Sequence, residues 1–180
     1  MSSLSVYLHS NPDIPDKVLT HFEDIAATLE EVGVRFERLP KVVIEAEIHA
    51  EELPSACYAT VEQLKSAHGY ASAEWLDLSR KHPQWEALRQ TMLDEQCQEA
   101  VGARWFVAGR GLLNLHIGER VYALQCERND LVATPAGTRY WLDIGEFPEL
   151  QLVSLSEHPQ GWQANPTGDD SAARFPRLDD

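Results

Sequence analysis

The sequence predicts a mainly β domain with flanking helices (α+β), in which short strands close into a β-barrel or jelly roll. A dense series of short strand-like segments follows residue 102, and Gly, Pro, Asn and Asp residues that favour turns separate the segments. Helical patterns occupy the region before them. Because 180 residues is the size of one domain with a real core, we expect residues 1–180 to form a single domain.

The predicted helices lie in the N-terminal half. The first covers residues 18–32, where apolar side chains recur at helical spacing and Gly33 follows as a natural stop. The second runs from about residue 51 to 67, with Gly69 after it. The third opens at Pro83, because proline suits the first turn of a helix.

The predicted strands are short, rich in β-branched and apolar residues, and bounded by turn residues. They cover residues 34–38, 75–78, 103–107, 112–117, 121–125, 131–134, 138–144 and 150–155. Strands in such close succession favour a barrel or jelly roll. The tail from residue 158 is rich in Pro, Gly and Asp, and we expect it to wrap over the surface.

Charge and composition exclude several classes of function. The net charge of -14 argues against binding of nucleic acid and of anionic membranes, since both require basic patches. No apolar run approaches the ~20 residues of a membrane-spanning helix, and the first residues do not resemble a signal peptide. The three cysteines have neither metal-type spacing nor an even count. We therefore expect a cytoplasmic monomer without disulfides.

Matched turns reveal a resemblance to a known family. They include Asp13-Ile14-Pro15, Gly109-Arg110-Gly111-Leu112, Pro135-Ala136-Gly137, Gly161-Trp162 and Phe175-Pro176-Arg177-Leu178. The chain resembles bacterial acireductone dioxygenases, which are cupin-fold enzymes of methionine salvage. The resemblance spans nearly the whole chain and is weakest from residue 40 to 67. It implies a cupin β-barrel.

The resemblance also implies the position of a metal site. The family carries a His-x-His-x3-Glu-x-Arg motif and a later His, which bind Fe2+ or Ni2+. The matching ligand positions hold Gln96, Gln98, Gly102 and Tyr140, and only Arg104 is retained. Imidazole and carboxylate groups suit first-row metals, whereas an amide is a weak donor and a phenol must lose a proton with a pKa near ~10. We therefore predict no metal at these positions and no cofactor.

Strand alternation nevertheless places these residues together. Residues two apart share a face, so that Gln96, Gln98, Gly102 and Arg104 point the same way. We expect Gln96, Gln98 and Tyr140 to satisfy one another by hydrogen bonds inside the barrel, with Arg104 at the rim.

Four residues are candidates for contacts with a small molecule. Arg104 and Tyr140 are the polar ones, and a buried guanidinium needs an anion, which is either a ligand or a carboxylate such as Glu95 or Glu99. Met92 and Leu142 are the apolar ones. They stand where the resemblance implies aromatic residues that pack on the substrate.

Other candidates give weaker signals. His116 has the same even parity as Arg104, but a lone histidine in a strand is best interpreted as a hydrogen-bonded structural residue. The seven histidines show no His-x-His or His-x3-His spacing, so the sequence indicates no replacement metal site. Cys97 has no visible cationic partner that would form a thiolate, and Cys57 and Cys126 fit apolar core patterns.

Three functions fit these observations. The favoured one is a non-catalytic member of the family that binds a small anionic or thioether metabolite, or acts as an interaction partner, in methionine salvage. The first alternative is an active acireductone dioxygenase, acting on 1,2-dihydroxy-3-keto-5-methylthiopentene and O2, with a rearranged metal site. The second is a metal-free enzyme that uses Arg104 and Tyr140 to enolise a ketone.

Overall fold

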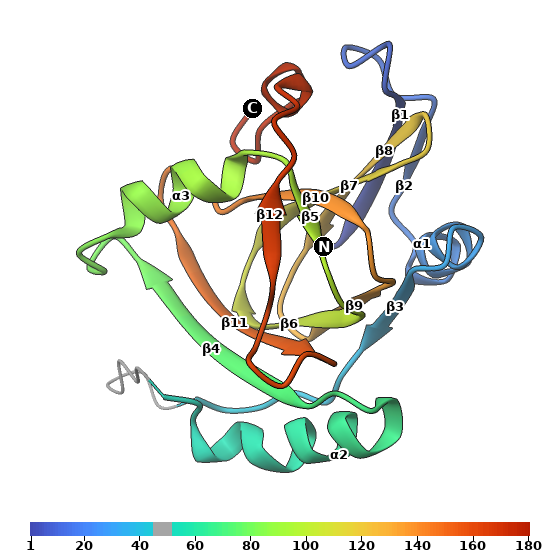
Figure 1. Ribbon diagram of the computed structural model, residues 1–180. Coiled ribbons are helices and arrows are strands. Elements are labelled where there is room, and N and C mark those ends of the chain that lie inside the picture. Colours follow the sequence, from blue (N-terminus) through green and yellow to red (C-terminus); the bar gives the residue numbers. More distant parts are fainter. Residues whose placement is uncertain (45–51) are drawn as a thin grey trace.

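The computed structural model describes residues 1–44 and 52–180, and two antiparallel β-sheets form its centre (Figure 1). The seven-stranded sheet has the order β12-β5-β10-β7-β8-β1-β2. Its strands are β1 (Ser3–Leu8), β2 (Lys17–Leu19), β5 (Gln96–Gln98), β7 (Gly111–Ile117), β8 (Arg120–Cys126), β10 (Arg139–Asp143) and β12 (Ala164–Pro166). The five-stranded sheet has the order β3-β9-β6-β11-β4. Its strands are β3 (Arg35–Arg38), β4 (Ser72–Ser79), β6 (Gly102–Gly109), β9 (Asp130–Thr134) and β11 (Glu149–Ser156).

The two sheets enclose one apolar interior, and this confirms the mainly β fold with flanking helices. Side chains from both sheets meet there, among them Phe106 of β6, Leu115 of β7 and Leu152 of β11, which are all buried. The strands alternate inward and outward residues, so that each sheet also has an outer face.

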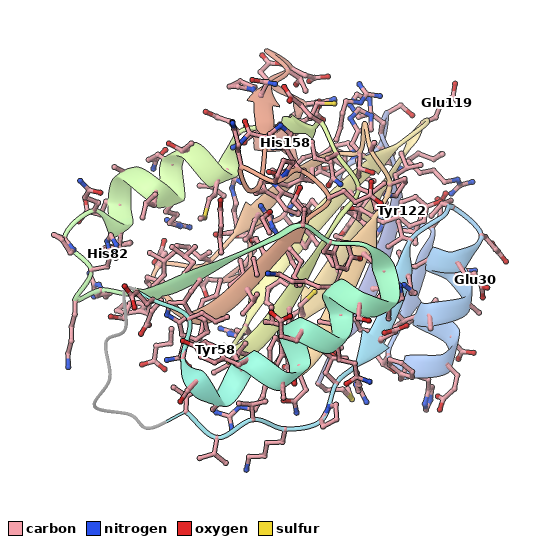
Figure 2. All side chains as sticks on the ribbon, turned by 60° about the horizontal axis from the view of Figure 1, so that its bottom comes forward. Glu30, Tyr58, His82, Glu119, Tyr122 and His158 are labelled. Atoms are coloured by element: carbon pink, nitrogen blue, oxygen red, sulfur yellow. The ribbon has the colours of Figure 1, made fainter. Side chains whose placement is uncertain are left out.

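The helices lie outside the sheets. They are α1 (Phe22–Glu30), α2 (Tyr58–His68) and α3 (Trp85–Leu93), with short 3-10 helices η1 (Ser55–Cys57) and η2 (Ser171–Arg174). Among the described residues, no helix has the length and apolar character needed to cross a bilayer. Figure 2 shows α2 running across one side of the molecule, with Tyr58 at its start.

The helix boundaries differ from the sequence-based ones at two points. Residues 18 and 19 belong to β2, because Val18 pairs with Ser5 at the edge of the sheet instead of continuing the helical pattern. α2 begins at Tyr58, later than predicted, and residue 51, where the pattern was placed, lies outside the described residues. Gly69 ends α2 in the left-handed conformation, with a φ of 76°, as the sequence predicted.

Each outer face has its own apolar cover. α2 packs Val61 and Leu64 against the five-stranded sheet, where they join the buried Trp105 of β6. The tail packs Phe175 against the seven-stranded sheet, where it meets Trp141 of β10. The predicted surface wrap is therefore the layer that covers this sheet.

The cysteines give a prediction that tests the core directly. Cys57 and Cys126 are fully buried, and burial raises the pKa of the Cys57 thiol to about 11 and that of the Cys126 thiol well above its usual value. Cys97 is partly exposed. Because the thiolate is the reactive form, we expect only Cys97 to react with a thiol reagent at pH 8 in the folded protein. A chromogenic thiol titration before and after denaturation checks this, and a second fast-reacting thiol in the folded protein would contradict it.

Candidate metal centre

The barrel interior brings together three of the residues singled out in the sequence. Gln98 of β5, Arg104 of β6 and Tyr140 of β10 line a small cavity of about 10 Å³, together with Thr134 of β9 and Trp162. The fourth, Gln96, turns elsewhere, and its side-chain amide donates to the backbone carbonyl of Thr91 at 3.1 Å.

Gln98 is satisfied by β9 and its own loop. The Thr134 hydroxyl donates to Gln98 Oε1 at 2.7 Å, and Gln98 Nε2 donates to the carbonyls of Ala100 at 2.9 Å and Thr134 at 3.2 Å. The prediction that Gln96, Gln98 and Tyr140 satisfy one another is therefore wrong. The neighbouring strand supplied partners that sequence spacing could not reveal.

Arg104 lies between two aromatic rings. Its guanidinium carbon is 4.6 Å from the ring centre of Tyr140 and 4.4 Å from that of Trp162. The Tyr140 hydroxyl accepts from Arg104 Nη2 at 3.3 Å and from Trp162 Nε1 at 2.9 Å. Arg104 Nε and Nη1 are buried and have no hydrogen-bond partner within residues 1–44 and 52–180.

The carboxylates considered as partners of Arg104 bind elsewhere. Glu95 is bonded to His116, and Glu99 accepts from the Asn165 amide. The apolar candidates are part of the core: Leu142 is buried, and Met92 of α3 is partly buried against the interior cluster.

Gly102 is close to Trp162. A methyl group at this position would lie 2.6 Å from the Trp162 ring and 2.7 Å from the carbonyl oxygen of Leu155. The carbonyl belongs to the sheet and cannot move freely. We expect Gly102→Ala to lower the free energy of unfolding by about 1–3 kcal/mol through overpacking, measured by urea denaturation. Gly118→Ala is the comparison variant. Gly118 has a φ of 62° and open space around it, so an alanine there introduces backbone strain without overpacking.

A second cluster lies on the other face of the seven-stranded sheet. His116 shares its side of β7 with Leu112, which packs beneath the tail, whereas Leu113 and Leu115 point into the barrel. His116 therefore does not face the barrel interior, although its number has the same parity as Arg104, and it is hydrogen-bonded to Glu95, as its interpretation as a structural residue expected. The sequence could not fix the phase of β7 relative to β6.

His116 meets two residues from distant segments. His9 follows β1, and Asp169 follows β12. One ligand atom from each of His9, His116 and Asp169 lies within 4.8 Å of the other two. His116 is buried, His9 is partly buried and Asp169 is exposed, so that the group opens to solvent on one side.

The loop position of His9 is fixed by its backbone. Its N–H donates to the carbonyl of Glu119, in the turn between β7 and β8, at 2.8 Å, and Figure 2 shows Glu119 at the end of the sheet. The His9 ring stacks on the His116 ring, with centroids 4.5 Å apart and planes within 1°. His9 Nε2 is buried and has no hydrogen-bond partner in the part of the chain that the structure describes. Buried polar atoms without partners are rare, and His9 Nε2 is therefore available to a ligand.

Asp169 supplies the negative charge of the group. Hydrogen bonding from Ser171 lowers the pKa of its carboxyl, and the neighbouring His9 and His116 act in the same direction. The Ser171 backbone N–H donates to Asp169 Oδ1 at 2.7 Å. The carboxylate therefore stays ionised at neutral pH.

Comparison with known proteins places the chain in a family. The model of the ARD/ARD' family matches residues 6–164. The chain belongs to this family. It is 50% identical to an acireductone dioxygenase of Pseudomonas fluorescens and 51% identical to one of Pseudomonas paraeruginosa, in both cases over all of this chain and all of the relative.

A solved structure has the same fold. An acireductone dioxygenase from Bacillus anthracis, described with a cadmium ion in its active centre, superposes with a TM-score of 0.76. It covers 92% of this chain and 98% of its own, at 15% sequence identity. The predicted cupin fold is confirmed.

These comparisons correct the functional expectations. Full-length relatives at about half identity are named as enzymes, so the expectation of a non-catalytic binding or interaction protein is wrong. The expected absence of a metal cofactor is corrected in the same way, because the structural neighbour is described with a metal ion and the described residues contain a group of suitable ligands. The histidine spacing missed this group because its members come from three separate segments.

Proposed function

We propose that the chain is an active acireductone dioxygenase with a rearranged metal site. The observation that carries the activity is the match, at about 50% identity and over the full length, to relatives named for it. The substrate is then a small anionic metabolite with a thioether tail, and O2 is the second substrate. This is also the class of small molecule that the sequence suggested as a partner.

We place the metal at His9, His116 and Asp169, with the His9 ring turned out of its stack on His116 so that both rings face the ion. Two imidazoles and one carboxylate are the donor set of many iron oxygenases, and such a set leaves coordination positions open. A divalent ion held there supplies Lewis acidity to polarise the substrate oxygens. The orphaned His9 Nε2 and the ionised Asp169 support the fit of these residues to a cation.

The three ligand residues differ in burial, and their roles differ accordingly. His116 is buried in a strand and supplies a fixed nitrogen, whereas Asp169 is exposed and leaves the group open to an incoming substrate. The carboxylate of Asp169 offsets one positive charge of the cation. Phe175 lies beside the His9 ring, with centroids 6.2 Å apart, and gives that side of the group an apolar neighbour.

The barrel-interior positions do not fit a divalent cation in this proposal. The amide of Gln98 and the hydroxyl of Tyr140 are engaged by protein groups, the Trp162 ring covers Gly102, and the guanidinium of Arg104 would repel a second cation. A cavity of about 10 Å³ has room for one water molecule. This volume is too small for a metabolite beside Arg104 and Tyr140, and Met92 and Leu142 do not line the cavity.

Oxygen uptake tests the proposal. Purified protein is loaded with Fe2+ or Ni2+ and mixed with an acireductone, and O2 consumption is compared with that of a metal-stripped sample. We expect consumption that requires the metal. Equal rates with and without metal would favour metal-free enolisation, and no consumption with either metal would overturn the proposed activity.

A further inference from the structure

We infer that Glu95 is a positioning residue for the metal centre, which sets the free nitrogen of His116 and anchors the loop that carries Asp169. The inference rests on the proposed function, since it concerns the same site. Glu95 precedes β5 and is 1% exposed, so its carboxylate is as buried as a core residue. A buried carboxylate is retained only with partners that satisfy it.

The first partner is His116. Glu95 Oε2 lies 2.6 Å from His116 Nδ1. An ionised carboxylate only accepts hydrogen bonds, so Nδ1 carries the proton and donates. In the neutral ring, the lone pair is then on Nε2, which is the atom left for a metal. A carboxylate behind a metal-binding histidine both orients the ring and makes it a stronger donor.

The second partner is Thr167, on the loop after β12. Its hydroxyl donates to Glu95 Oε1 at 2.8 Å, and its backbone N–H donates to the Glu95 carbonyl at 3.1 Å. The Asp169 N–H in turn donates to Thr167 Oγ1 at 3.2 Å. Glu95 is therefore connected to Asp169 through one residue, and both of its carboxylate oxygens are in use.

The third ligand is not set by Glu95. His9 lies flat against His116, and the nitrogen lone pairs of two parallel rings point along separate planes. His9 therefore turns out of the stack when it binds the same ion as His116. Glu95 acts on the other two members of the group, His116 directly and Asp169 through Thr167.

The test measures metal affinity and not turnover. Glu95→Gln keeps the shape of the side chain but removes its charge and places an amide donor in the pair. We expect the dissociation constant for Co2+, measured by calorimetry, to rise about 10–100-fold. We also expect the visible absorption bands of bound Co2+ to shift, because the His116 ring turns.

Two further variants keep the test decisive. Asp130→Asn alters another buried carboxylate, which accepts from Ser2 and Arg38 far from this group, and should leave Co2+ affinity and spectrum unchanged. Thr167→Val keeps Glu95 and removes only the hydroxyl that links it to Asp169, so it should weaken Co2+ binding less than Glu95→Gln does. This variant tests the inference if Glu95→Gln fails to fold.

The outcomes separate the two claims. Wild-type affinity and spectrum in both Glu95→Gln and Thr167→Val would overturn the positioning role and leave the metal site intact. Absence of Co2+ binding by the wild-type protein would overturn the metal site and this inference together, whereas loss of oxygen uptake with Co2+ binding retained would count against the proposed reaction alone.

Discussion

Replacement of His116 by alanine is expected to reduce metal-dependent oxygen uptake by more than about 100-fold, since loss of a ligand exceeds the 10–100-fold effect of losing a ligand's hydrogen-bond partner. The variant removes the buried member of the group and leaves the Glu95 carboxylate without its partner. Oxygen consumption with saturating Fe2+ measures the activity, and elemental analysis measures the metal retained per chain. Both should fall together.

The matched control is His82→Ala. His82 precedes α3, and Figure 2 shows it on the opposite side of the molecule from Glu119, whose carbonyl holds the His9 backbone. We expect His82→Ala to keep the wild-type rate and metal content. Full activity in His116→Ala, in a protein with a wild-type melting profile, would show that the metal is held elsewhere.

Replacement of Trp162 by alanine is expected to lower the free energy of unfolding by roughly 3 kcal/mol, at the low end of the range for tryptophan because the ring is only partly buried. The ring covers Gly102, donates to the Tyr140 hydroxyl and forms one of the two faces around the Arg104 guanidinium. Its removal leaves Arg104, whose Nε and Nη1 already lack hydrogen-bond partners among the described residues, with a single aromatic face. Chemical denaturation monitored by far-UV circular dichroism measures the change.

A phenylalanine at the same position separates the contributions. Trp162→Phe retains a ring over Arg104 but loses the hydrogen bond from Nε1 to Tyr140. We expect its loss of stability to be smaller than that of the alanine variant. If both variants matched the wild type, the ring would not hold the interior together.

The turns made the fold predictable. The predicted strand at residues 112–117 is β7 and that at 121–125 is β8, because Gly118 forces a tight turn between them with a φ of 62°. The short strands at the sheet edges were harder to predict from the sequence. β2 and β12 have three residues each, too few for a pattern, and their pairing with β1 and β5 comes from tertiary contacts.

The candidate site was predictable only in part. Strand parity and the closure of a barrel predict that Gln98, Arg104 and Tyr140 point into one interior, and the three residues line the same cavity. It could not show that Thr134 satisfies Gln98, since hydrogen-bond partners depend on register between strands distant in sequence.

The second group left no sequence signal. His9, His116 and Asp169 meet because β1 and β7 both pair with β8 and because the tail returns over the sheet after β12. None of these contacts is encoded in the spacing of the three residues. A search restricted to short ligand motifs therefore finds no metal site in this chain.

Anomalous diffraction from crystals grown with Co2+, recorded at the cobalt absorption edge, tests the central claim most directly. We predict one strong peak that contacts a ring nitrogen of His9, Nε2 of His116 and a carboxylate oxygen of Asp169. A peak inside the barrel, between Gln98 and Tyr140, or no peak in a crystal of an active enzyme, would contradict it.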